Sequence, residues 1–333
     1  MNLQTQVLIP KASFKISHQS EILLMGSCFS ENIGDKLKSN KFAVNVNPFG
    51  ILYNPISIYN ALNRLLENKL FTENDFIHYN GSYHSFMHHG SFSKSNLSEA
   101  VDNVNYEFSA ASNHLENADV LLITFGTSYI FKWNESQEIV GNCHKIPANK
   151  FTRERLSIDD IYSAWRNLIK RIITQNPNIK PVFTVSPIRH FKDGAHENQL
   201  SKAILHLSID MLMHEFPKNA FYFPAYEIVM DQLRDYRFYT DDMLHPSILA
   251  QTYIWKRFSE TFFSIITQKI IAEWQKICQA LSHRPHDPNS NEYIKFLNRT
   301  IKNLQAFQEK YTYLHCSPEK RHLTQLLQNI HKE

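Results

Sequence analysis

Short apolar runs of strand length alternate with longer amphipathic segments along this chain, and this alternation limits the possible folds more than any other feature. The runs expected to be strands are Ile22–Met25, Phe42–Val46, Val120–Phe125, Pro181–Val185 and Ala220–Phe223. They are nearly continuous in apolar character, as strands are when both faces of a parallel sheet are buried. Because parallel strands need long crossover connections, which are usually helical, the alternation predicts an α/β fold with helices on both faces of the sheet.

The segments between these runs carry apolar residues three and four positions apart, which is the spacing of one face of a helix. The expected helices cover residues 57–67, 157–175, 198–216 and 249–263. Ser157 is a suitable N-cap for the second of them. At the start of the third, Lys202 could reach inward.

The character of the chain changes after about residue 265. A polar, proline-containing loop at 283–293 is followed by two charge-rich amphipathic segments at 294–311 and 317–333, which we expect to be helices. We therefore expect residues 1–262 to form the main domain, with an insertion at about 70–118. Residues 263–333 are expected to form a helical extension that packs on the domain or on an oligomer partner.

Composition excludes several classes of protein. A formal net charge of +3 over 333 residues, without a compact basic block, does not indicate a nucleic-acid-binding protein. No segment is long and apolar enough for a signal peptide or a membrane span. The four cysteines (Cys28, Cys143, Cys278 and Cys316) are widely spaced, which favours reduced thiols over disulfides or a zinc site. These observations predict a cytoplasmic protein without a metal or cofactor.

Polar or small residues follow each expected strand at its carboxyl end, where ligands bind in open parallel sheets. The first strand ends in Gly26-Ser27-Cys28, the second in Asn47-Pro48-Phe49-Gly50, the third in Gly126-Thr127-Ser128 and the fourth in Ser186-Pro187-Ile188-Arg189-His190, and "YTDDMLHPS" follows the fifth. We expect these groups to meet at one crevice.

Ser27 is the first candidate nucleophile, because a serine between a strand and a helix exposes its hydroxyl near backbone N–H groups at the helix N-terminus. A base must remove its proton, and Asp242 and His245, three positions apart, could act as the orienting carboxylate and the base. The alternative is that Gly26-Ser27 is an ordinary turn and that Asp242 caps the following helix. Cys28 competes for the nucleophile role, because a helix N-terminus lowers the pKa of a thiol. The alternative is that Cys28 is simply a small buried residue at the end of the strand.

Histidines gather in "HYNGSYHSFMHHG", but they lack the helical zinc spacing, so no metal is predicted. We expect this segment to form a wall or lid over the crevice, with His89 facing the substrate. His144 and His190 are further candidates for substrate contacts. Arg189 could bind a carboxylate or phosphate, or could pair with Asp193 or Glu197.

Five segments occur in the order of a known family. They are "GSCFSENIGDKL", "NPFGILYNPISI", "NCHKIP", "SPIRHFKDGAHENQLSKA" and "DDMLHPS". Over about residues 1–260 the chain resembles the GSCFA family, although Ser30 stands where the family name has alanine. That family is placed with the SGNH/GDSL hydrolases. The resemblance implies a flavodoxin-like three-layer α/β/α sandwich, with the five expected strands in the order 2-1-3-4-5.

The resemblance also implies roles for individual residues. Ser27 matches the superfamily's catalytic serine, and Asp242 and His245 match its Asp-x-x-His block. Gly50 occupies the position of the superfamily's second oxyanion-hole glycine. Gly126-Thr127-Ser128 stands where the superfamily has Gly-x-Asn, so the usual side-chain amide donor is missing. Thr127 or Ser128 would have to take its place, or Asn142 could supply an amide from another loop. Losing one such donor typically costs about 10²–10³ in rate.

The sequence thus predicts a serine-dependent esterase or acyltransferase that uses Ser27, His245 and Asp242. The Ser27 and Gly50 N–H groups, with Ser128 or Asn142, would stabilise the oxyanion. The substrate would be a small or carbohydrate-like acyl compound. The residues expected to contact it are Cys28, Asn47, Thr127, His89, His144, Arg189 and His190. The alternatives are a non-catalytic binding protein that uses the same crevice and an acyltransferase that depends on Cys28.

Overall fold

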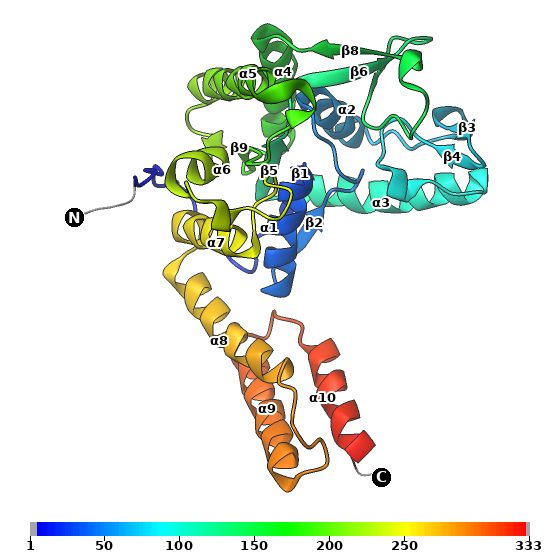
Figure 1. Cartoon of the computed structure of the whole chain (residues 1–333). Coiled ribbons are helices and arrows are strands. Elements are labelled where there is room, and N and C mark those ends of the chain that lie inside the picture. The colour runs from blue at the N-terminus through cyan, green and yellow to red at the C-terminus, as the bar shows by residue number, and fades with distance from the viewer. Residues whose placement is uncertain (1–4, 331–333) are drawn as a thin grey trace.

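A five-stranded parallel sheet forms the centre of the computed structural model, which describes residues 5–330 (Figure 1). Its strands are β1 (Ile22–Gly26), β2 (Val44–Val46), β5 (Val120–Phe125), β9 (Lys180–Val185) and β10 (Phe221–Tyr222), arranged in the order β10-β9-β5-β1-β2. All four pairings are parallel. These are the five strands predicted from the sequence, and the predicted order 2-1-3-4-5 is confirmed.

Helices cover both faces of this sheet. They are α1 (Cys28–Ser39), α2 (Pro55–Leu66), α3 (Leu97–Asn117), α4 (Ile158–Gln175), α5 (Gly194–Glu215), α6 (Ala225–Glu227) and α7 (Ile248–Phe262). Three further helices follow along the chain, α8 (Ile265–Leu281), α9 (Asn291–Lys310) and α10 (Ser317–Ile330). Alternate residues of each central strand belong to different cores: Leu23 and Met25 pack in the core under α2, α3, α4 and α5, and Ile22 and Leu24 in the core under α1 and α7. The continuous apolar runs therefore reflect burial on both faces, and the predicted three-layer α/β/α class is confirmed.

Two excursions leave the sheet near its carboxyl edge. The first, within the expected insertion at 70–118, contains a hairpin of β3 (Ile77–Tyr79) and β4 (Ser82–His84). The end of that stretch is α3, whose Val104 and Phe108 belong to the main core, so it is part of the helical layer. The second excursion is an antiparallel sheet of β6 (Tyr129–Trp133), β7 (Ile139–Val140) and β8 (Phe151–Arg155), which the sequence did not predict.

The last three helices have a core of their own and extend away from the sheet (Figure 1). They contact α1 and its C-terminal turn through Trp274, whose indole N–H donates to the Ser39 carbonyl at 2.8 Å, and through a 2.6 Å ion pair between Lys41 and Glu319. The expected helix at 317–333 is present as far as residue 330, and residues 331–333 lie outside the described part. The domain boundary at 262/263 and oligomerisation through these helices stay predictions. None of the helices within residues 5–330 is long and apolar enough to cross a membrane.

Candidate active site

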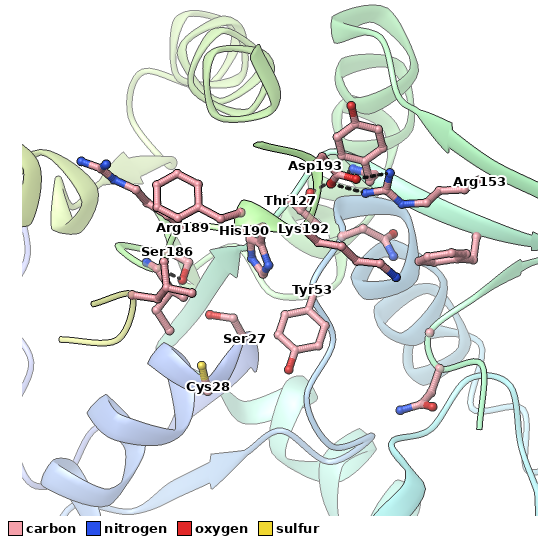
Figure 2. Close-up of a pocket in the computed structure, with 18 of the residues that line it drawn as sticks. Ser27, Cys28, Tyr53, Thr127, Arg153, Ser186, Arg189, His190, Lys192 and Asp193 are labelled. Atoms are coloured by element: carbon pink, nitrogen blue, oxygen red, sulfur yellow. Dashed lines mark hydrogen bonds and ion pairs between the residues drawn. The ribbon is translucent and has the colours of Figure 1, made fainter. Parts of the chain in front are cut away.

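A cavity of about 540 Å³ opens at the carboxyl edge of the sheet. Its lining comes from the ends of β1 and β9, the loops after β2 and β5, the β6–β8 sheet, and the loop before α7. Ser27, Cys28, Thr127, Asn142, Arg189, His190 and His245 all line it. The structure therefore brings together seven of the residues singled out in the sequence, from segments far apart in the chain (Figure 2).

The turn between β1 and α1 holds Ser27 at the inner end of this cavity. Gly26 has a φ of +145°, and a Cβ there would lie 2.3 Å from the Thr124 carbonyl oxygen, so the turn requires glycine. Ser27 is the N-cap of α1, and its Oγ accepts a 3.3 Å hydrogen bond from the Phe29 N–H. The strand thus ends by placing a hydroxyl at the positive end of a helix.

Asp242 and His245 form a tight pair at the cavity mouth. The Oδ2 atom of Asp242 lies 2.5 Å from Nδ1 of His245, and both side chains are about half exposed. The Oδ1 atom accepts from the N–H groups of His245 and Leu244 and from the Thr240 hydroxyl, at 2.8–2.9 Å. The His245 N–H, together with these other donors, holds the pKa of Asp242 well below its usual range. The carboxylate is therefore fixed and charged, and it orients the imidazole.

Ser27 and His245 line the same cavity, but within residues 5–330 no hydrogen bond joins them. Nor does the Nε2 atom of His245 bond to any group in this part of the chain. Catalytic hydrogen bonds are often long or absent before a substrate binds. The exposed loop that carries the pair would have to move for this bond to form.

Two expected oxyanion donors lie elsewhere, and these are corrections. The Gly50 N–H donates to the Asn47 carbonyl at 2.7 Å, and Gly50 packs against His89 outside the cavity. Ser128 is fully buried, and its N–H and hydroxyl both donate to Ser201 Oγ, at 2.8 and 3.0 Å. The turn at Asn47 uses the Gly50 donor, and Ser201 in α5 accepts both donors of Ser128, so neither set is available to an oxyanion.

Asn142 and Thr127 do reach the cavity. The Oδ1 atom of Asn142 accepts from the His144 N–H at 2.8 Å, and its amide Nδ2 bonds to no other group in residues 5–330. The Thr127 N–H donates to the Tyr53 carbonyl at 3.1 Å, and the Thr127 hydroxyl is hydrogen-bonded to the Ser201 hydroxyl at 3.2 Å. Of these two side chains, Asn142 is the one with a donor still available.

Three residues expected to contact substrate support the site from outside the cavity instead. Asn47 is buried, and its Oδ1 accepts from the Gly26 N–H at 2.9 Å, which fixes the turn before Ser27. His89 caps the short helix at Gly90–Phe92 through the Ser91 N–H. His144 is buried, bonds the Ser85 carbonyl at 2.9 Å, and has its pKa lowered to about 4 by burial.

His190 and Arg189 line the cavity as expected. Burial lowers the pKa of His190 to about 4, so its imidazole is neutral at physiological pH. Neither proposed ion pair of Arg189 forms, because Asp193 pairs with Arg153 at 2.6 Å and Glu197 with Arg155 at 2.7 Å. Arg189 contacts the Met230 sulfur at 2.9 Å, and Figure 2 shows it extending away from Ser27.

Cys28 lines the cavity beside Ser27, but burial raises the pKa of its thiol, and Glu31 adds to the effect. The expected lowering of this pKa is therefore not found. A raised pKa leaves less thiolate at neutral pH, which favours Ser27 over Cys28 as the nucleophile.

Sequence reasoning missed part of the lining: Tyr53, Phe131, Arg153, Lys192 and Asp193. Most of these come with the β6–β8 sheet and the loop after β9. The aromatic and β-branched residues that dominate "YIFKW" could have indicated β6. No group of three or more potential metal ligands occurs within residues 5–330.

Comparison with known proteins gives two family matches. The model of the GSCFA family matches residues 21–258, and the model described as GSCFA domain protein, C-terminal domain, matches residues 274–329. No curated protein matches the chain. Among solved structures, the chain is similar to a Clostridium thermocellum family 3 carbohydrate esterase, with 11% identity and a TM-score of 0.35, over 75% of this chain and 96% of that one.

Proposed function

The chain belongs to the GSCFA family, and we propose that it is an SGNH-type, serine-dependent acyl hydrolase or acyltransferase. One observation carries this proposal. A serine at the N-terminus of α1 and His245, more than 200 positions away in the sequence, line the same cavity, and Asp242 is hydrogen-bonded to that histidine. A nucleophile, a base and a group that orients the base are the set that acyl transfer through serine requires.

The proposed reaction begins with attack of Ser27 Oγ on the acyl carbonyl carbon while Nε2 of His245 takes the hydroxyl proton. Asp242 holds the Nδ1–H and stabilises the imidazolium that forms. The N-terminus of α1 and the Asn142 amide would stabilise the oxyanion. The alcohol leaves with the proton from His245. Water or an acceptor hydroxyl then attacks the acyl-serine, and its proton passes to His245. The bond between the acyl carbon and Ser27 Oγ breaks, Oγ takes the proton back from His245, and the acid or the new ester leaves.

The lining supports a polar, carbohydrate-like acyl ester as the substrate. Tyr53, Phe131 and Phe191 present aromatic surface, and Figure 2 shows Lys192 reaching into the cavity above Tyr53. Within residues 5–330, neither Lys192 nor Arg189 has a carboxylate within ion-pair distance. Such a surface suits a ring that carries hydroxyl groups and a negative charge.

The second candidate is a binding protein that holds a ligand in the same cavity without turnover. It is favoured by the absence of a Ser27–His245 hydrogen bond and by the positions of Gly50 and Ser128. A fixed and charged Asp242 beside a half-exposed imidazole favours the enzyme, because a binding site has no need for an oriented base. Acyl transfer by Cys28 is the third candidate, and the raised pKa of its thiol argues against it.

The test is turnover of 4-nitrophenyl acetate and of acetylated sugars by wild type and three variants. We expect Ser27→Ala and His245→Ala to lose turnover while keeping the fold, and Cys28→Ala to retain it. Loss of activity in Cys28→Ala alone would assign the reaction to the thiol. Absence of turnover in wild type, with sugar esters still binding, would assign the cavity to a binding protein.

A further inference from the structure

Lys202 in α5 is a fully buried cation that the proposed reaction does not use. Only 2% of the residue is exposed, and it ranks among the largest fully buried side chains of the chain. Its Nζ atom donates to the carbonyl of Gly126 at 2.7 Å and to that of Ser186 at 2.8 Å. Gly126 follows β5 and Ser186 follows β9, so the ammonium joins the carboxyl ends of two neighbouring strands.

The charge on this side chain has no counter-ion. Among residues 5–330, no carboxylate lies within ion-pair distance of Lys202, and the ring of Tyr226 is 5.5 Å from Nζ. Burial lowers the pKa of Lys202 to about 7, so it carries its charge in mildly acidic solution. A buried, unpaired charge is costly, and apolar residues of similar volume are usually tolerated in its place. Two carbonyl bonds alone do not explain why the chain places a lysine here.

The position of Lys202 relative to the cavity supplies an explanation. Ser186, whose carbonyl accepts from Lys202, lines the cavity. So does Thr127, which follows Gly126, the other residue that accepts from Lys202. Burial raises the pKa of the Cys28 thiol and lowers that of the His190 imidazole, and the charge of Lys202 acts downward on both pKa values, so the field of the ammonium reaches both residues. Cys28 is adjacent to Ser27, and the other charged or ionisable groups that face Cys28 are Glu31 and Tyr53.

We propose that Lys202 is a positioning residue of this cavity, which ties the ends of β5 and β9 together and makes the Ser27–Cys28 end favourable for negative charge. An oxyanion formed at Ser27 would be stabilised by this charge, and that part of the inference rests on the proposed function. The effect on Cys28 does not, because a thiolate there is stabilised whether or not the protein is an enzyme. In the deprotonated state above neutral pH, Lys202 would keep its position and lose its electrostatic effect.

Alkylation of Cys28 measures the charge directly. We would treat wild type, Lys202→Gln and Lys202→Met with iodoacetamide at pH 6, where Lys202 is charged, and follow each cysteine peptide by mass spectrometry. Glutamine keeps N–H donors for the two carbonyls but has no charge, whereas methionine keeps only the volume. Cys143 lines the same cavity, and its thiol pKa is affected by Lys192 rather than Lys202, so it is the internal control.

We expect the Cys28 reaction to be about threefold slower in both variants, since losing a nearby positive charge raises a thiol pKa, and half a pKa unit is about a threefold change in thiolate. The Cys143 rate should not change. An unchanged Cys28 rate in Lys202→Gln would overturn the proposal, and loss of the fold in both variants would do so too, by assigning Lys202 a structural role. If wild type hydrolyses esters, Lys202→Gln should lower kcat with little effect on KM. Absence of turnover would remove the proposed function but leave the alkylation result standing.

Discussion

Three buried histidines should make this protein sensitive to mild acid. Burial lowers the pKa of His88 to about 3 and the pKa values of His144 and His190 to about 4. In the unfolded chain each imidazole has a pKa near 6.5. Between these values the unfolded state binds protons that the native state does not, so stability is full above pH 6.5 and is lost as the pH falls. His18, whose pKa burial also lowers, adds in the same direction.

The size of the stability loss follows from how far the chosen pH lies below 6.5, the pKa of each imidazole in the unfolded chain. At pH 5.0 each site is 1.5 units below its unfolded pKa and still above its native one, so each lowers the free energy of unfolding by about 2 kcal/mol, or about 6 kcal/mol for the three. Carboxylates contribute little, because their unfolded pKa values lie near 4. A loss of this size is comparable to the whole stability of a typical domain, about 5–15 kcal/mol.

The assay is urea unfolding at pH 7.5 and 5.0 of wild type, His88→Phe and His214→Gln. His88 stacks on Phe49 with ring centroids 4.7 Å apart, so phenylalanine keeps the aromatic packing and removes the titration. Comparing the two pH values within each protein cancels any constant packing change. We expect His88→Phe to recover about 2 kcal/mol of the loss, and the exposed His214 variant to recover none. An equal loss in wild type and His88→Phe would refute the reasoning, because His88 would then not be neutral in the native state.

Three further predictions concern the site. Asp242→Asn should lower kcat by about 10²–10⁴, as loss of the orienting carboxylate does in serine hydrolases, with KM little changed; an unaffected kcat would remove Asp242 from the mechanism. Lys192→Gln should raise KM about tenfold for an anionic acyl ester and leave that for a neutral ester unchanged, and equal effects on both esters would contradict a charge contact. Gly26→Ala should lower the free energy of unfolding by about 2–4 kcal/mol in urea, because its Cβ would meet the Thr124 carbonyl; wild-type stability would show that the turn can relax.

The sheet was predictable because its strands are buried on both faces. Val120–Phe125 is apolar at every position except Thr124, and such a run has few other structural interpretations. The small β6–β8 sheet was not predicted, because its strands are half exposed and mix charged residues with aromatic ones. Residues of Phe151–Arg155 after the first are all exposed, so they give no burial signal.

The candidate site was predictable where residues lie at strand ends. Ser27 and His190 follow central strands, and a parallel sheet must bring their carboxyl ends to one edge. Gly50 and Ser128 also follow strands, but their donors bond to Asn47 in the same turn and to Ser201 in a distant helix, and spacing alone does not reveal these partners. Family resemblance pointed to these positions in the chain, but it could not supply the direction of their N–H and O–H groups.

Fluorophosphonate labelling of the purified protein, with the modified peptide identified by mass spectrometry, tests the central claim most directly. The account predicts a single adduct on Ser27, formed by wild type and by Cys28→Ala, and lost in His245→Ala. A protein that keeps its fold but takes no label, or takes it independently of His245, would contradict the claim that Asp242 and His245 activate Ser27.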